Sequence, residues 1–467
     1  MIKKSLGDIA VMCGGQLQNN EDSGLSVQGV VTDSRQITLG CLFVPLVGER
    51  FDGHHFAADC LGAGASACLW ESSKGTPPGP AVLVEDTLAA LQNLAKAYRE
   101  ESGVKVVGIT GSNGKTTTKD LVFALLSKRY KVHKTQGNYN NHIGLPLTLL
   151  AMPEDTEIAV LEMGMSGRGE IELLSKLGEP ETAIITNIGE SHLLQLGSRE
   201  EIARAKLEIL AGMKLGGLLV YNGDEPLIAG VLAEPDMPKP ELLQTMTFGL
   251  TPYNDLYPTG IMFLDDRTVF TPSGDQADPV ELPLLGEHNV SNALAAIAIA
   301  RHYGVSEAFI REGLGEAELT GMRIEMVIGE SGITVLNDAY NASPTSMKAA
   351  IGVLGTMKGY RRKIAVLGDM LELGPDEEAY HYEVGSSLTP DKADLLFTYG
   401  PLSGHIARGA QKHLTPGSIH AYTDKSELIG KLIEHLHPQD VVLVKASRGM
   451  RLEEVVEAVK FSKLDQP

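Results

Sequence analysis

The chain has 467 residues, of which 43% are hydrophobic and 21% charged, and its formal net charge is −20. This length exceeds one ordinary hydrophobic core, so about two to four domains are expected, and the composition is typical of a soluble globular protein. The negative charge argues against broad, sequence-independent nucleic-acid binding, because a phosphate backbone would meet a repelling field. A small anionic substrate held by a few local cations is still compatible with it.

The N-terminal region shows neither a membrane segment nor a secretory signal. No apolar run approaches the roughly 20 residues that a membrane-spanning helix needs. Asp8 interrupts the stretch after the two N-terminal lysines, so a signal peptide is not expected.

The cysteines, at positions 13, 41, 60 and 68, show no C-x-x-C spacing. We therefore expect reduced, buried thiols in a cytoplasmic protein rather than zinc ligands or a disulfide.

The first of three blocks covers residues 1–100 and mixes short strands with helices. The glycines and prolines of ESSKGTPPGP (71–80) indicate a surface loop. The other expected elements are strands over 27–33 and 81–86 and helices over 54–64 and 87–100. This pattern predicts a small α/β domain.

The second block, residues 101–318, alternates strand and helix signals. Apolar strands at this spacing predict a parallel sheet covered by helices on both faces. Segments 246–250, 260–266 and 267–274 are expected to form a small antiparallel addition, and 289–304 a strongly apolar helix. The strands of the parallel sheet are expected over 105–110, 130–135, 157–164, 182–189 and 216–224.

The third block, residues 319–467, repeats the alternation. Its expected strands are 332–338, 362–369, 394–400 and 440–446, separated by helices such as 343–355 and 451–460. We predict a second doubly wound, Rossmann-like α/β domain. The whole chain is therefore expected to be an α/β protein of three domains.

A glycine-rich loop follows the first strand of the second block. In GITGSNGKTTTKD (108–120), Ile109 stands where the strict phosphate-loop pattern requires its first glycine. Glycines let the backbone turn its N–H groups toward a phosphate, and the start of a helix adds a positive dipole end. Lys115 would then reach the β- and γ-phosphates, and the Thr116 hydroxyl would bind magnesium. The alternative is a tight turn with an exposed lysine, but this order of strand, glycines, Lys-Thr and helix is uncommon, so we predict nucleotide binding.

Two further polar residues follow strands of the same sheet. Glu162 ends the strand EIAVL at the carboxyl edge, where open α/β sheets place their ligands, and a carboxylate there can hold magnesium. His192 follows the neighbouring strand in TNIGESH. An exposed strand-end glutamate and a structural histidine are the alternatives. Lys206, in IARAKLEIL, is by spacing alone an ordinary solvated helix lysine.

The segment ITGSNGKTTTKD (109–120) resembles the phosphate loop of the Mur ligases, which has the form T-G-[ST]-N-G-K-T. The similarity extends over essentially the entire chain. Further matching segments are GNYNNHIGLPLTLL (137–150), LEMGMSGRGEI (161–171), TNIGESHL (186–193), GEHNVSNALAA (286–296), GMRIE (321–325), NDAYNASPTSM (337–347), VLGDMLELG (366–374) and KASRGMRLE (445–453). Within the family, GNYNNHIG with NDAYNASP is most similar to the branch that adds D-alanyl-D-alanine to UDP-N-acetylmuramoyl-tripeptide.

The resemblance implies an ATP-dependent carbon–nitrogen ligase of peptidoglycan biosynthesis. ATP would phosphorylate the terminal carboxylate of the UDP-tripeptide, and the resulting acyl phosphate would accept D-alanyl-D-alanine, releasing ADP and phosphate. It implies a UDP-binding first domain (1–100), a central phosphate-loop ATPase-type domain (101–318) and a Rossmann-like third domain (319–467). We expect a cytoplasmic monomer that uses ATP and two magnesium ions and binds no nucleic acid.

The resemblance also implies roles for individual residues. Lys206 would be carbamylated and, with Thr116, Glu162 and His192, would hold magnesium; the catalytic set is then Lys115, Glu162, His192 and Lys206. The expected ATP-binding residues are Thr110, Gly111, Ser112, Asn113, Gly114, Lys115, Thr116, Thr117, Asn289, Asn292, Arg323 and Asp338. The expected contacts to the UDP-substrate are Ser34, Arg35, Asp52, Gly53, His54, Asn138, Asn140 and Asn141, and those to the dipeptide are Ser447 and Arg448. As plain sequence, Ser34 and Arg35 fit a turn equally well, and Asn289 and Asn292 fit helix caps.

Three other functions are alternatives to this one. A tripeptide-forming Mur ligase specific for diaminopimelate would carry a D-N-P-R motif in the third block, where this chain has NASP (341–344). Folylpolyglutamate synthase shares the last two domains but lacks a UDP-binding first block, so residues 20–70 argue against it. An ATP-binding regulator without turnover is disfavoured because the whole catalytic set of Lys115, Glu162, His192 and Lys206 is present.

Overall fold

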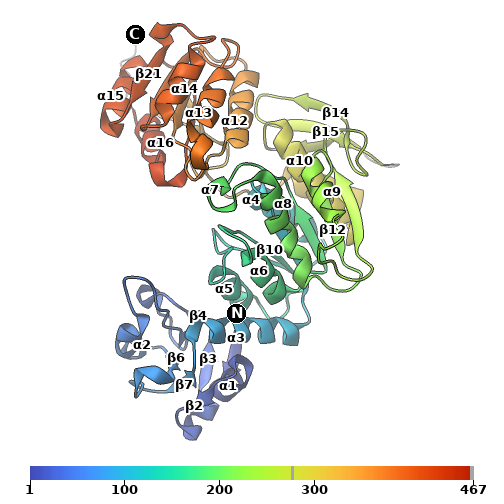
Figure 1. Cartoon of the computed structure of the whole chain (residues 1–467), viewed down its shortest axis with the longest axis vertical. Helices are drawn as coiled ribbons and strands as arrows, with labels where there is room; N and C mark the ends of the chain where they lie inside the picture. Colours follow the sequence, from blue (N-terminus) through green and yellow to red (C-terminus); the bar gives the residue numbers. More distant parts are fainter. Residues whose placement is uncertain (275–277, 463–467) are drawn as a thin grey trace.

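The computed structural model describes residues 1–274 and 278–462. Three α/β units lie in a row along the long axis, with the first unit in blue, the central unit in green to yellow and the third in orange to red (Figure 1). Within the described residues, no helix has the length and apolar character needed to cross a membrane. The four cysteines are free and buried, as predicted.

The first unit contains a five-stranded sheet in the order β2-β7-β6-β5-β4, parallel except for β2. A separate antiparallel pair, β1 and β3, lies beside it. Its strands are β1 (Lys3–Ser5), β2 (Gln16–Leu17), β3 (Ser26–Gln28), β4 (Val30–Val31), β5 (Leu42–Phe43), β6 (Ala67–Glu71) and β7 (Ala81–Val84), and its helices are α1 (Leu6–Cys13), α2 (Ala57–Gly62) and α3 (Thr87–Ser102).

Helix α3 joins the first unit to the central unit. Asp86 caps its start by accepting a hydrogen bond from the Ala89 N–H, and Gly103, with φ of 62°, ends it in the left-handed conformation. One apolar cluster runs from Leu6 of α1 through Leu94 of α3 to the central unit. Burying this continuous apolar surface stabilises the contact between the two units.

The central unit is built on six parallel strands in the order β13-β12-β11-β8-β10-β9. Because side chains alternate along a strand, Val107 and Ile109 of β8 pack on one face and Val106 on the other. The elements of the sheet are β8 (Lys105–Thr110), α4 (Lys115–Leu126), β9 (Val132–Lys134), α5 (Gly144–Ala151), β10 (Ile158–Glu162), α6 (Glu170–Gly178), β11 (Thr182–Ile185), α7 (Leu193–Leu196), α8 (Arg199–Leu207), β12 (Leu218–Asn222), α9 (Pro226–Leu232) and β13 (Gln244–Phe248). The remaining elements are β14 (Pro258–Phe263), β15 (Thr268–Pro272), β16 (Val280–Leu282), α10 (Glu287–His302) and α11 (Glu307–Gly315).

One sequence prediction for the central unit is wrong. Segment 246–250 was expected in the antiparallel addition, but β13 pairs in parallel with β12 and forms the edge of the main sheet. Helix α9, between the two strands, is the crossover that a parallel pair requires. The antiparallel addition itself exists and consists of β14, β15 and β16. The predicted strand 267–274 corresponds to β15, which ends at Pro272.

The third unit has a six-stranded sheet in the order β17-β18-β22-β19-β20-β21, parallel except for β17. Strands β17 and β21, both at sheet edges, were not predicted. Its elements are β17 (Glu325–Ile328), β18 (Thr334–Asp338), α12 (Pro344–Thr356), β19 (Arg362–Gly368), α13 (Glu377–Ser386), β20 (Leu395–Tyr399), α14 (Ser403–Ala410), β21 (Ile419–Tyr422), α15 (Lys425–His435), β22 (Asp440–Lys445) and α16 (Glu453–Lys460).

Candidate active site

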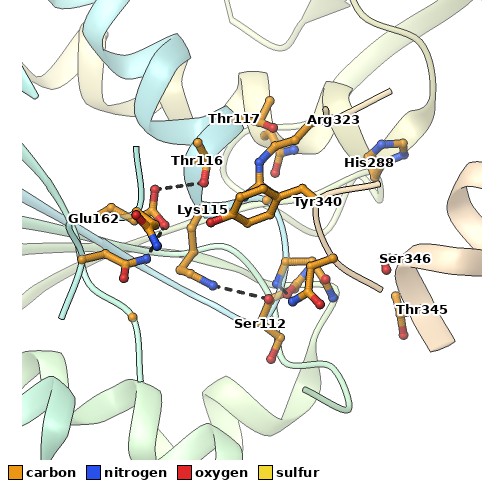
Figure 2. A pocket seen from close by; sticks show the side chains of 18 of the residues that line it. Ser112, Lys115, Thr116, Thr117, Glu162, His288, Arg323, Tyr340, Thr345 and Ser346 are labelled. Atoms are coloured by element: carbon orange, nitrogen blue, oxygen red, sulfur yellow. Dashed lines mark hydrogen bonds between the residues drawn. The ribbon is translucent and has the colours of Figure 1, made fainter. Parts of the chain in front are cut away.

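A cavity of about 400 Å³ lies where the central and third units meet. The central unit lines it with the phosphate loop, the residues after β10 and the start of α10, and the third unit with the end of β18 and the start of α12 (Figure 2). The carboxyl ends of the central strands β8 and β10 and of β18 in the third unit therefore face the same space. This is the edge at which open parallel sheets bind ligands.

The phosphate loop has the backbone that the sequence predicts. Gly111 and Gly114 have φ of 146° and 80°, and a methyl group on either would overlap Thr186 or Asn292, so only glycine fits. Helix α4 begins at Lys115 with no side-chain cap. Its first N–H groups are thus available to an anion.

The side chain of Lys115 is held in place by backbone carbonyls of the phosphate loop. Its Nζ donates to the Gly111 carbonyl at 2.8 Å and lies 3.4 Å from the Ser112 carbonyl. Burial lowers the pKa of this ammonium, and the Glu162 carboxylate opposes that effect. The amine is thereby placed beside the helix start, where a phosphate would sit.

Glu162 forms the centre of a polar cluster. Its Oε2 accepts a hydrogen bond from the Thr116 hydroxyl at 2.9 Å, and its Oε1 accepts one from Asn140 Nδ2 at 2.8 Å. The Nζ of Lys119, on the buried face of α4, is 4.0 Å away. The structure thus brings together Thr116, Glu162 and Asn140, which come from three separate sequence motifs.

His192 lines the cavity from a strained backbone. Its φ is 66°, in the left-handed region that residues with side chains seldom adopt and that is frequent at functional sites. Its Nδ1 lies 2.9 Å from Glu372 Oε2 of the third unit. Burial lowers its pKa, with a further contribution from Lys206, while Glu372 acts in the opposite direction.

Lys206 is almost completely buried, with 1% of its surface exposed. Burial holds its pKa well below the usual value, Lys115 adds to the shift, and Glu208 and Glu170 oppose it. No described residue forms a hydrogen bond or ion pair with its Nζ. The side chain is therefore not the solvated helix lysine that spacing alone predicts, and this prediction is wrong because α8 packs its Lys206 face inward.

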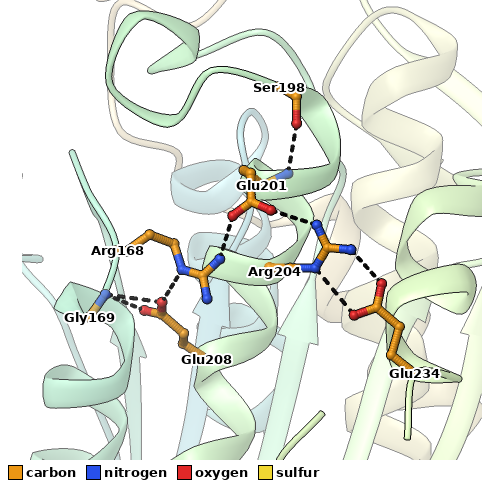
Figure 3. Close-up of polar contacts among 7 residues, drawn as sticks. All are labelled: Arg168, Gly169, Ser198, Glu201, Arg204, Glu208 and Glu234. Carbon is orange, nitrogen blue, oxygen red and sulfur yellow. Dashed lines mark hydrogen bonds and ion pairs between the residues drawn. The ribbon is translucent and has the colours of Figure 1, made fainter. Parts of the chain in front are cut away.

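An ion-pair network holds α8 in position (Figure 3). Arg168 donates to Glu201 and Glu208, both at 2.8 Å, and Arg204 pairs with Glu201 and Glu234, both at 2.6 Å. Arg168 lies in the loop that follows β10, so the network joins the loop after Glu162 to the helix that carries Lys206.

The third unit contributes cationic and acidic side chains to the cavity. The Arg323 guanidinium lies 4.4 Å from the centre of the Tyr340 ring, and its buried Nε has no hydrogen-bond partner. Asp338 pairs with Lys445 at 2.7 Å. Burial raises the pKa of Asp338, and Lys445 opposes this. Asn292, across the cavity on α10, bonds to neighbouring side chains of the central unit.

Comparison with known proteins identifies the family. The model of the "Mur ligase middle domain" matches residues 109–300, that of the "Mur ligase, glutamate ligase domain" residues 322–448, and that of the "Mur ligase family, catalytic domain" residues 26–107. The chain belongs to the Mur ligase family. Its fold of three α/β domains agrees with the sequence prediction.

This Mur ligase has similar relatives over its full length. It is 50% identical to a Bacillus subtilis protein named UDP-N-acetylmuramoyl-tripeptide–D-alanyl-D-alanine ligase, with 98% of each chain covered. A solved structure of MurF from Acinetobacter baumannii superposes with a TM-score of 0.87 at 30% identity, covering 98% of this chain and 99% of the other. MurF from Thermotoga maritima, solved in complex with ADP, gives 0.80 at 30% identity, with coverages of 93% and 97%.

The substrate residues predicted in the first unit of this Mur ligase do not line the cavity. Arg35 is exposed and forms an ion pair with Asp33. Asp52 accepts from the His54 backbone at 3.0 Å and lies 2.7 Å from its ring, and Lys74 donates to it at 2.6 Å. These contacts hold a turn together, and a role in UDP binding stays a prediction for them, as for Ser34 and Gly53.

The predicted dipeptide residues also lie outside the cavity lining. Ser447 Oγ accepts a hydrogen bond from the Leu371 N–H at 2.9 Å, and Arg448 forms an ion pair with Glu453 at 3.2 Å. Asn138, Asn140 and Asn141, by contrast, all line the cavity.

Sequence reasoning missed several polar side chains of the site. Lys445 ends β22 next to Asp338, and its place at the carboxyl end of an apolar strand was a usable signal. Tyr340 and His288, which line the cavity, and Lys119, which is buried beside Glu162, gave none, because only tertiary packing brings them to these places. Glu170, at the start of α6, was also missed. Burial lowers the pKa of His288 to about 4, so its ring is neutral.

Proposed function

We propose that this chain joins D-alanyl-D-alanine to the terminal carboxylate of UDP-N-acetylmuramoyl-tripeptide, using ATP and releasing ADP and phosphate. The name of the 50% identical relative supports this reaction, and the ADP complex of a similar MurF structure supports ATP use. The observation that carries the proposal is the cavity between two units, which is lined by the phosphate loop of the central unit and by polar side chains of both units. The product is a precursor of peptidoglycan.

A carboxylate is a poor electrophile, so ATP must first convert it into an acyl phosphate, which the amine then attacks. The residues needed for this are phosphate-binding groups and cations that oppose the developing charge. The start of α4 and Lys115 supply them from the central unit, and Arg323 from the third. Both units must therefore stay close during the reaction.

The residues around Glu162 fit a magnesium ion. Its carboxylate and the Thr116 hydroxyl, 2.9 Å apart, are hard oxygen donors of the kind magnesium prefers. The described residues contain no group of three or more His, Cys, Asp or Glu side chains that could hold a metal ion by themselves. That is expected for magnesium, which keeps water and phosphate ligands. When bound, the ion would neutralise phosphate charge.

We place a second magnesium ion near His192 and propose that Lys206 serves it as a carbamate. Only a neutral amine reacts with carbon dioxide: the nitrogen forms the new bond to carbon, and one amine proton is released. The burial of Lys206, its lowered pKa and the lack of a partner for Nζ among the described residues all favour the neutral form. The carbamate would supply two hard oxygens in place of a repelling ammonium.

The nucleoside would occupy the end of the cavity nearest α10 and β18. Asn289 and Asn292, both buried at the start of α10, can offer amide donors and acceptors to adenine, and Asp338 can accept from ribose. Asn289 Nδ2 donates a hydrogen bond to the Leu285 carbonyl at 2.9 Å. The side-chain oxygen of Asn289 accepts one from Asn292 Nδ2 at 3.2 Å. Both roles rest on the family resemblance.

We propose residues 1–100 as the UDP-binding domain, 101–318 as the ATP-binding domain and 319–467 as the domain that closes on the nucleotide. Ser447 and Arg448 would contact the dipeptide once the third unit moves. The substrates, ATP and a UDP-linked precursor, place the reaction in the cytoplasm, and we expect a monomer.

Mass spectrometry of the product tests the function. ATP, UDP-muramoyl-tripeptide and D-alanyl-D-alanine should give the UDP-muramoyl-pentapeptide with one phosphate released per product. Parallel reactions would supply UDP-muramoyl-dipeptide with diaminopimelate or lysine, or folate with glutamate. Product in either parallel reaction but none in the first would assign the chain to another ligase, and no phosphate release in any would mean a regulator.

A further inference from the structure

One carboxylate of the cavity has no cation partner. The acidic side chains that line the cavity are Glu162, Glu170 and Asp338. Asp338 pairs with Lys445 at 2.7 Å, and Glu162 lies 4.0 Å from the Nζ of Lys119. Glu170 forms no ion pair with any residue in the described part of the chain. Its charge acts on the buried Lys206, whose pKa it raises, but no cation forms a direct ion pair with it among these residues.

The position of Glu170 does not depend on its own carboxylate. It begins α6, directly after Arg168 and Gly169, which Figure 3 shows bound to Glu208. Arg168 Nε donates to Glu208 at 2.8 Å, and the Gly169 N–H at 2.9 and 3.0 Å to its two oxygens. The helix start is thus fixed from outside the cavity.

Within the described residues, the carboxylate accepts one hydrogen bond. Its Oε2 accepts from the Ser166 N–H at 3.1 Å, and Oε1 accepts no hydrogen bond from the described residues. A carboxylate oxygen can accept two hydrogen bonds, so most of the capacity of Glu170 is unused. Glu170 lines the same cavity as Asn140, Asn141 and Lys115.

An unpaired carboxylate near a polyphosphate is unfavourable unless a cation comes between them. We propose that Glu170 binds a primary ammonium of the substrates, namely the amino group of D-alanyl-D-alanine, and so positions the nitrogen that attacks the acyl phosphate after the ammonium has lost a proton. This inference rests on the proposed function. A second source of a primary ammonium is the side chain of the third peptide residue, when that residue is lysine or diaminopimelate.

Steady-state kinetics of Glu170→Gln tests the proposal. Glutamine keeps an oxygen that can accept from the Ser166 N–H and removes only the charge. Losing a hydrogen bond between charged groups should raise the KM for D-alanyl-D-alanine by about tenfold or more, with the KM for ATP and the magnesium dependence unchanged. The matched control is Glu172→Gln, on the same helix, where Glu172 pairs with Lys176 outside the cavity; its constants should equal those of the parent.

Two further arms identify the ammonium. N-acetyl-D-alanyl-D-alanine, which lacks it, should inhibit parent and Glu170→Gln equally if Glu170 binds the dipeptide amine. Acetylating the lysine side chain of the UDP-tripeptide should raise the parent's KM for that substrate, and leave the KM of Glu170→Gln unchanged, only if Glu170 binds that amine instead, which would keep the ammonium site and change its source. Unchanged KM values for both substrates in Glu170→Gln, or a shift confined to ATP or magnesium, would overturn the proposal. Ligation by the parent would still establish the proposed function in that case.

Discussion

Replacing Lys206 tests the most unusual feature of the site, a lysine that is 1% exposed and has a pKa held well below its usual value. Lys206→Met fills a similar volume without a titrating group. Each unit by which the folded pKa lies below the unfolded one costs about 1.4 kcal/mol of stability at a pH under both values. In buffer free of carbon dioxide at neutral pH, the variant should therefore unfold with a higher free energy than the parent.

The sign of the pH dependence follows from proton binding. Between the folded and unfolded pKa values of Lys206, the unfolded chain binds more protons, so the stability of the parent rises with pH. This rise ends near the unfolded value of about 10.5. The difference in the free energy of unfolding between Lys206→Met and the parent should thus be largest at low pH and should disappear as the pH increases. Denaturant unfolding at a series of pH values measures it.

Turnover of the same variant tests the carbamate. Without the two carbamate oxygens, phosphate release should fall by on the order of a hundredfold or more, as for loss of one preorganised electrostatic contact. Acetate should partly restore Lys206→Ala, and the parent with ¹³C-bicarbonate should show a carbamate carbon signal absent from Lys206→Met. Lys214→Met is the control, because Lys214 is 41% exposed and pairs with Glu181 at the surface. Full activity of Lys206→Met or Lys206→Arg would refute the carbamate.

Three other outcomes are expected. Lys115→Ala should lower turnover by on the order of a hundredfold with an unchanged melting temperature, because the phosphates lose a preorganised cation; near-normal turnover would remove Lys115 from the mechanism. Lys445→Met should lower the free energy of unfolding by about 3 kcal/mol, because it leaves Asp338 buried and unpaired. Adding Asp338→Asn should recover part of that loss, and equal stability of the single and double variants would contradict the pairing. Small-angle scattering should show a smaller radius of gyration with an ATP analogue and UDP-tripeptide, because the cavity is lined by both units; an unchanged radius would mean that the units are already closed.

Much of the nucleotide half of the site could be predicted from local sequence. Gly111 and Gly114 occur where the backbone takes positive φ, and Lys115 begins the helix that follows. Glu162 and Asp338 end apolar strands, and parallel strands bring their carboxyl ends to one edge. These features depend on backbone conformation and on strand direction, which the residues themselves encode.

The sequence by itself therefore determined the three α/β units, the phosphate loop and the strand-end carboxylates. Tertiary structure alone decided which partners those groups have: His192 meets Glu372, 180 positions away, and Lys445 meets Asp338 across 107. It also placed segment 246–250 in the main sheet, buried Lys206 and left Glu170 without a cation. Contacts of this kind depend on strand order and helix packing, which are set by the burial of apolar faces between distant segments rather than by local spacing.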